Sequence, residues 1–251
     1  MTALILILVG VTVAVIARGL APGLNERRVV FGETPDQPKP FGYRMSWLAI
    51  KTTDTAAVLN VLALYDAVPA NWNSGIGTVY DDRLSDNYVF VSPPVKGWTL
   101  VAGVPLPHPV GHAFTDKLSP LLLLLSQSFG DVQYFASFPI IDFFAWTRVY
   151  KGRVVRAFVI GDDGVIWDRG RLTPEEKALG LKCFDLRGIK GRKGDAGGAI
   201  VLYPTEEQVL RIASAWSCNP LQIDKLQIND GIGFVARVPQ SWRAERVKRA
   251  A

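Results

Sequence analysis

The chain has 251 residues, of which 49% are hydrophobic and 20% are charged, and its formal net charge is +5. This composition excludes a disordered or low-complexity protein and is typical of one mid-sized domain with additional segments. The basic residues gather in a loop at 187–198 and in the tail from Trp242 onwards, without the interleaved aromatic residues of a nucleic-acid surface. No nucleic-acid partner is therefore expected, and two cysteines do not indicate a disulfide framework.

The N-terminal segment is an uncharged apolar run. A helix over residues 2–21 would be about 30 Å long, which matches the hydrocarbon thickness of a bilayer. The alternatives are a buried helix and a cleaved secretory signal. The signal is disfavoured because no Lys or Arg precedes the apolar run and Pro22 follows the best cleavage position. We expect residues 2–21 to be a transmembrane anchor, so the membrane is one expected partner.

Positive charges lie on the C-terminal side of this segment, at Arg18, Arg27, Arg28 and Lys39. Basic residues beside a membrane span favour the cytoplasmic side. The sequence therefore predicts a single-pass inner-membrane protein with its domain on the cytoplasmic side. The opposite topology would make the domain periplasmic or secreted.

Three segments follow the anchor. Residues 22–42 contain four prolines and mixed charges, which is typical of an extended linker. A single domain is expected over 43–238, and a basic tail over 239–251.

The first half of the domain is predicted to contain strands and one helix. A strand is expected at 45–51, then a helix that is capped by Thr53 or Asp54 and ended by Pro69. A loop at 70–77 leads into strands near 88–91 and 97–104.

The next helix is predicted from the cap Ser119 to the stop at Gly130. Its run of leucines indicates a core helix that is covered on several sides. An antiparallel meander should follow, because Lys151-Gly152 and Asp163-Gly164 are typical of tight turns. Its strands are expected at 131–137, 140–150, 153–161 and 165–170.

The last part of the domain has two helix starts in capping-box spacing, at Thr173 and Thr205. A hairpin over 226–238 is expected to close the domain. This order of elements predicts an α+β fold, with a largely antiparallel mixed sheet and several packed helices.

Several segments between Trp47 and Pro220 are distinctive as a set: WLAIKT, ANWNSGI, VFVSPPVKGWTLVAG, LSQSFGDVQYFAS, AWTRVYKGRVVRAFV, GRLTPEEKALGL and PTEEQVLRIASAWSCNP. In these segments the chain resembles a group of uncharacterised bacterial α+β proteins. The resemblance implies one compact domain, of a kind sometimes met in the setting of bacterial toxin and immunity genes. It implies no particular catalytic residue.

A weak metal-site pattern occurs at His108, His112 and Asp116. Residues spaced by four share one face of a helix, where two imidazoles and a carboxylate could bind zinc. Pro109 and Gly111 argue against a helix here, so we expect a loop with two exposed histidines and no metal.

A hydrolase-like enzyme with a dispersed site is the alternative function. Its candidates are His108, His112 and a cysteine, either Cys183 or Cys218, whose thiol would need a nearby imidazole or helix N-terminus to lower its pKa. No phosphate loop, nucleophile elbow or dinucleotide fingerprint occurs, and no cofactor is expected.

The loop at 70–77 is the best candidate for a contact surface. Aromatic residues with a polar group dominate protein interfaces, and Trp72 lies here between Asn71 and Asn73. We therefore expect a membrane-anchored protein-interaction or immunity-like domain without catalytic activity, in which these three residues contact a protein partner. Substitution of Trp72 should then abolish capture of the partner and leave stability intact.

Overall fold

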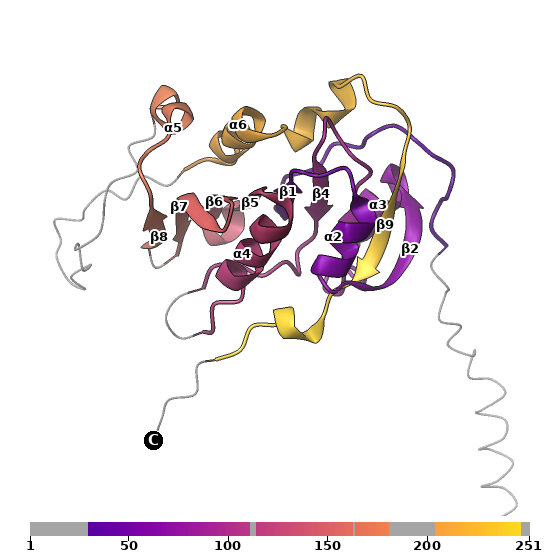
Figure 1. Ribbon diagram of the computed structural model, residues 1–251, viewed down its shortest axis with the longest axis horizontal. Coiled ribbons are helices and arrows are strands. Elements are labelled where there is room, and N and C mark those ends of the chain that lie inside the picture. Colours follow the sequence, from indigo (N-terminus) through magenta and orange to yellow (C-terminus); the bar gives the residue numbers. More distant parts are fainter. Residues whose placement is uncertain (1–29, 111–113, 163, 181–203, 247–251) are drawn as a thin grey trace, which may run out of the picture. The chain divides into compact units, whose positions relative to one another are not determined.

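The computed structural model describes residues 30–110, 114–162, 164–180 and 204–246 (Figure 1). The chain divides into two compact units, Met1–Val30 and Phe31–Ala251, and the description below concerns the second. Within the described ranges, no helix combines the length and the apolar character needed to cross a membrane. The predicted anchor at 2–21 lies outside those ranges.

One antiparallel sheet organises the described part of the second unit. Its strand order is β2-β9-β3-β4-β1-β5-β6-β7-β8. The strands are β1 (Met45–Ile50), β2 (Tyr65–Asn71), β3 (Tyr88–Val91), β4 (Thr99–Ala102), β5 (Asp131–Phe138), β6 (Phe143–Tyr150), β7 (Arg153–Gly161), β8 (Gly164–Arg169) and β9 (Ile232–Arg237).

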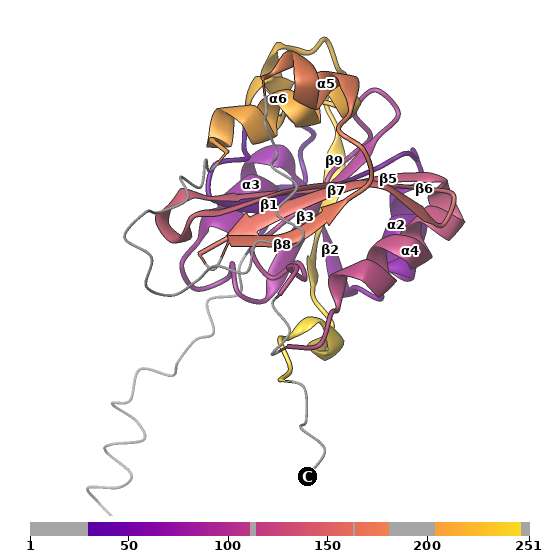
Figure 2. The same cartoon turned by 90° about the vertical axis from the view of Figure 1, so that its left-hand side faces the viewer.

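Helices cover both faces of this sheet. They are α2 (Thr55–Val61), α3 (Trp72–Tyr80), α4 (Leu118–Phe129), α5 (Pro174–Ala178) and α6 (Glu206–Trp216), with short 3₁₀ helices η1 (Pro139–Ile141), η2 (Pro220–Lys225) and η3 (Gln240–Trp242). Figure 2 shows α5 and α6 on one side of the sheet and α2 and α4 on the other. Since α3 shares a core cluster with α6, it covers the same face as α6. The predicted α+β class with a large antiparallel sheet is confirmed.

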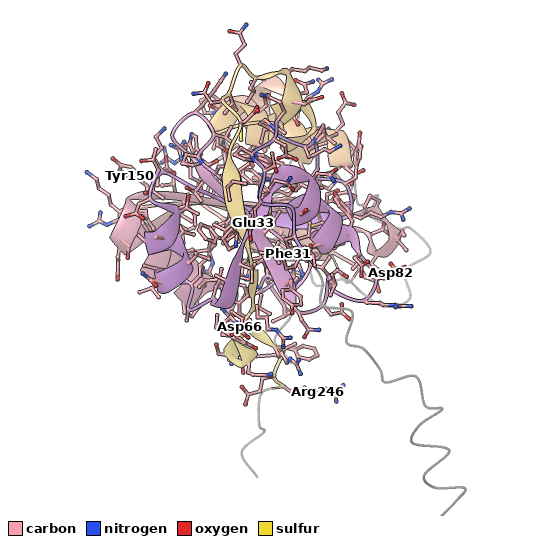
Figure 3. The ribbon with its side chains drawn as sticks, turned by 90° about the vertical axis from the view of Figure 1, so that its right-hand side faces the viewer. Phe31, Glu33, Asp66, Asp82, Tyr150 and Arg246 are labelled. Carbon is pink, nitrogen blue, oxygen red and sulfur yellow. The ribbon has the colours of Figure 1, made fainter. Side chains whose placement is uncertain are left out.

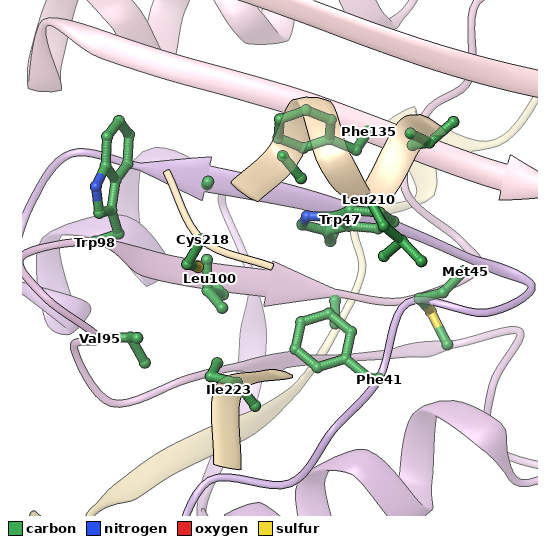
Figure 4. Close-up of a cluster of buried hydrophobic side chains, with 14 of the residues drawn as sticks. Phe41, Met45, Trp47, Val95, Trp98, Leu100, Phe135, Leu210, Cys218 and Ile223 are labelled. Atoms are coloured by element: carbon green, nitrogen blue, oxygen red, sulfur yellow. The ribbon is translucent and has the colours of Figure 1, made fainter. Parts of the chain in front are cut away.

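The larger core lies between the sheet and α6. Trp47 of β1 stacks on Phe135 of β5 with ring centroids 5.2 Å apart, and Phe41 packs edge-on against the same indole (Figure 4). Leu210 of α6 belongs to the same buried cluster. Burial of each such side chain contributes about 1.5–3 kcal/mol, which holds α6 on the sheet.

Local signals placed several elements correctly. The strands β5 to β8 form the predicted meander. Lys151 and Gly152 have φ values of 46° and 74°, as a two-residue hairpin turn requires. Thr173 and Thr205 both form complete capping boxes, at the starts of α5 and α6.

Several details of the predicted elements are wrong. The first predicted helix ends at Val61, so Tyr65 and Pro69 lie in β2, an edge strand that tolerates proline. The predicted hairpin over 226–238 does not form. Residues 226–228 are not a strand, and β9 pairs with β2 and β3, which are distant in the chain. The leucine run of α4 is buried on one side only, and Leu124 is 48% exposed.

The predicted linker and tail are partly integrated into the domain. Asp36 forms a β-bridge with Gly231, and Phe41 is buried in the core. The tail residue Trp242 is likewise buried. Residues 31–42 therefore belong to the compact unit rather than to an extended tether, because their apolar and hydrogen-bonding side chains find partners there.

Candidate functional site

The predicted contact loop at 70–77 is not an exposed loop. Trp72 begins α3, is 1% exposed, and packs edge-on against Phe90 with ring centroids 5.3 Å apart. Asn71 is the N-cap, and its side chain accepts a hydrogen bond from the Ser74 amide. Of these three residues, only Asn73 is exposed to solvent. The prediction that Trp72 offers an exposed contact is wrong, because its side chain is buried.

The chain itself already occupies the N-terminus of α3. The Asp36 carboxylate accepts hydrogen bonds from the amides of Trp72 (2.7 Å) and Asn73 (3.0 Å). Phe31 and Glu33, which precede Asp36 in the chain, lie at the edge of the sheet where β2 and β9 pair (Figure 3). A negative charge at a helix N-terminus is stabilising, which explains why this segment is held there.

The predicted metal spacing does not produce a metal site in the described structure. The Asp116 carboxylate accepts hydrogen bonds from the amides of Leu118 and Ser119 and so caps the first turn of α4. Ser119 is therefore not the cap that its sequence position suggests. His112 lies outside the described residues. Among those that are described, no group of three or more His, Cys, Asp or Glu side chains could hold a metal ion.

His108 is enclosed by aromatic rings. Its Nε2 lies 3.2 Å from the Val104 carbonyl oxygen, and its Nδ1 lies 2.7 Å from the Tyr134 hydroxyl. A carbonyl only accepts, so Nε2 carries the proton, and the Tyr134 hydroxyl donates to Nδ1. Burial lowers the pKa of His108 to about 4, although the bond to Val104 opposes this. The imidazole is therefore neutral at pH 7, and both nitrogens are engaged.

The cysteine candidates do not join His108. Cys218 is buried in the core cluster on the face of α3 and α6, whereas the Tyr134 side chain beside His108 belongs to the cluster on the opposite face. Burial raises the pKa of the Cys218 thiol to about 12, and the charge of Lys96 only partly opposes this. Cys218 is thus a protonated core residue, and Cys183 lies outside the described residues.

An apolar hollow lies beside His108. This cavity has a volume of about 740 Å³, and its lining includes Val104, His108, Phe114, Phe138, Ile141 and Phe143. Such a size lies within the range of ligand and side-chain binding pockets. The apolar hollow is the feature of the described structure that is best suited to binding.

An exposed apolar turn adjoins this hollow, and its residue Ile141 is part of the lining. Pro139 begins η1 between β5 and β6, and Asp142 adopts φ 48° after it, so the chain turns sharply here. Ile140 is 76% exposed and Ile141 is 61% exposed. Exposed apolar side chains beside an apolar cavity are typical of an interaction surface.

A second, more polar cavity of about 480 Å³ adjoins the first. The two cavities share Val104, His108 and Val110, and the second is also lined by Lys117 and Arg243. The segment after β4 therefore separates an apolar hollow from a polar one.

The C-terminal segment packs against Phe114, a lining residue of the apolar hollow. Phe114 forms a β-bridge with Arg246, whose guanidinium lies 5.9 Å from the centroid of the Phe114 ring. A cation over an aromatic face is a favourable contact that fixes Arg246 beside Phe114.

Sequence reasoning named His108 only as a weak metal or hydrolase candidate and expected it to be exposed, whereas the ring is enclosed by Tyr134, Phe138 and Phe143. It missed the other lining residues. It assigned Ile140 and Ile141 to a continuous strand at 140–150, although Pro139 is a signal that a strand is interrupted. Pro139 followed by two apolar residues and Asp142 could have predicted an exposed apolar turn.

Comparison with models of protein families found no match for this chain, and no match was found among the curated proteins or the solved structures. Its function must therefore be inferred from the residues of the site itself.

Proposed function

We propose that this chain is a membrane-tethered protein-interaction domain that binds an apolar segment of a protein partner in the apolar hollow. The observation that carries the proposal is the cavity of about 740 Å³, whose lining includes the exposed Ile141, with the exposed Ile140 next to it in the chain. The resemblance to bacterial proteins from toxin and immunity settings supports an immunity-like role. The apolar segment at 2–21, which is uncharged from Ala3 to Ala17, supports a tether in the inner membrane, and the basic residues that begin at Arg18 support a domain on the cytoplasmic side.

The engaged nitrogens of His108 and the protonated thiol of Cys218 give no support to the hydrolase alternative. Neither group is poised as a base or a nucleophile. Binding is therefore the function that the described residues support best.

The tether is tested by fractionation of cells that express the full chain. We expect the unprocessed protein in the membrane fraction after a high-salt wash. The double variant Leu8→Arg/Val11→Arg should move to the soluble fraction, because each arginine at the centre of a span costs about 2.5–3.5 kcal/mol of insertion free energy. The control Leu24→Arg places an arginine after the span and should stay in the membrane. Full-length wild-type protein in the soluble fraction without detergent would contradict the tether.

The binding site is tested by capture of partner proteins from native membranes with the detergent-solubilised full chain. Ile141→Asp should reduce capture by about tenfold or more, because a charge replaces an apolar contact at the hollow. Leu124→Asp is the matched control, since Leu124 is a similarly exposed apolar residue on α4. Equal capture by Ile141→Asp and wild type, with both variants folded, would rule out the hollow as the binding site.

A further inference from the structure

A knob and a hole lie on one surface of this domain. The knob is the η1 turn, where Ile140 and Ile141 are 76% and 61% exposed. The hole is the apolar hollow, and Ile141 itself belongs to its lining. A two-fold rotation that brings the knob of one copy to the hole of a second copy also brings the second knob to the first hole. This surface is therefore suited to pairing with itself.

Two opposite charges flank these apolar parts. Asp142 follows the knob directly and is exposed, and the guanidinium of Arg246 lies over Phe114, a residue that lines the hole. Within the described part of the chain, neither Asp142 nor Arg246 belongs to an ion pair. By contrast, the neighbouring Lys117 is paired with Glu245 at 3.1 Å. The exposed Asp162 also lines the hole, so the positive charge offered to Asp142 of a second copy is that of Arg246. Asp142 and Arg246 are complementary between two copies.

We propose that the occupant of the apolar hollow is the η1 turn of a second copy of this chain, with Asp142 of each copy beside Arg246 of the other. This inference rests on the proposed function, because it names the partner of the same hollow. The contact of the η1 turn with the hollow and the pair of Asp142 with Arg246 each occur twice in a two-fold dimer, so the binding free energy includes each contact twice. Tethering in one membrane would further raise the effective concentration of the copies.

Charge exchange tests this pairing directly. The dissociation constant of the dimer is measured by light scattering on the detergent-solubilised full chain over a concentration series. We expect Asp142→Arg and Arg246→Asp each to raise it by about tenfold, because two ion pairs are lost and like charges meet. The double variant Asp142→Arg/Arg246→Asp should restore it to within about threefold of wild type, because the pairs reform with opposite sign.

A control variant and a second test variant make the experiment specific. Asp224→Arg makes the same charge change on the exposed surface of η2 and should leave the dimer unchanged. Ile140→Asp alters a side chain that is mostly exposed, so the fold should persist while the dimer is lost.

The outcomes separate this inference from the proposed function. A full chain that stays monomeric, or a double variant that is not restored, overturns the dimer. If capture of other proteins still depends on Ile141 in that case, the proposed binding function stands. If neither dimerisation nor capture depends on Ile141, both fail.

Discussion

Replacement of Glu176 by Ala is expected to lower the free energy of unfolding by about 3–5 kcal/mol. The Glu176 carboxylate is fully buried, accepts from Arg156 Nε at 2.8 Å, and also accepts from Trp146 Nε1 and the Thr173 amide. Burial by itself lowers the pKa of Arg156, but hydrogen bonds and charges from Asp168 and Glu176 outweigh it and raise the pKa. Without Glu176, a buried guanidinium would keep only Asp168 as its acidic partner.

Gln208→Ala is the matched control for this prediction. Gln208 occupies the same capping-box position in α6 that Glu176 occupies in α5, but its bond to the Thr205 amide is exposed. Its loss should cost about 0.5–1.5 kcal/mol, as is usual for one hydrogen bond. Urea unfolding monitored by circular dichroism gives both values. A Glu176→Ala effect no larger than that of Gln208→Ala would show that the buried ion pair contributes little.

The free energy of unfolding is expected to fall by about 2 kcal/mol between pH 7.5 and pH 5 through His108 alone. Burial lowers the pKa of His108 to about 4 in the folded protein, whereas the unfolded value is about 6.5. Between these two values the unfolded chain binds the proton and the folded protein does not, so stability is lost as the pH falls below 6.5. The loss continues until the pH approaches 4.

His108→Gln should abolish this part of the pH dependence. The glutamine amide still offers a donor toward the Val104 carbonyl and an acceptor toward the Tyr134 hydroxyl, but it does not titrate. The chain contains two histidines, so His112 is the remaining imidazole in the variant. Urea unfolding at pH 5 and pH 7.5 checks the difference. An equally steep pH dependence in His108→Gln would refute the assignment to this residue.

Local sequence signals predicted the elements whose structure depends on a few neighbouring residues. The capping box of Thr173 with Glu176 and the turn at Lys151-Gly152 are formed as predicted. In each of them the interacting groups lie within four residues, so tertiary packing is not needed to select them.

The region at 70–77 shows why other predictions failed. Gly75 and Gly77 favour a loop on propensity, yet they lie within α3. A Cβ atom on Gly75 would lie 2.1 Å from the Phe90 side chain, so the glycine permits close packing of α3 on β3. The sequence does not reveal this role of Gly75, because it depends on the packing of Phe90 against α3 in the folded protein. The same packing buries Trp72, which sequence reasoning placed on the surface.

The sequence by itself determined the α+β class, the meander and the capping boxes at Thr173 and Thr205, because apolar periodicity and local hydrogen bonding encode them. Only the tertiary structure decided that His108 is held by Tyr134, that Trp72 is buried, and that Ile141 lines an apolar hollow. These properties depend on contacts between residues distant in the chain. Such contacts depend on the order of strands in the sheet, which the periodicity of a single strand does not specify.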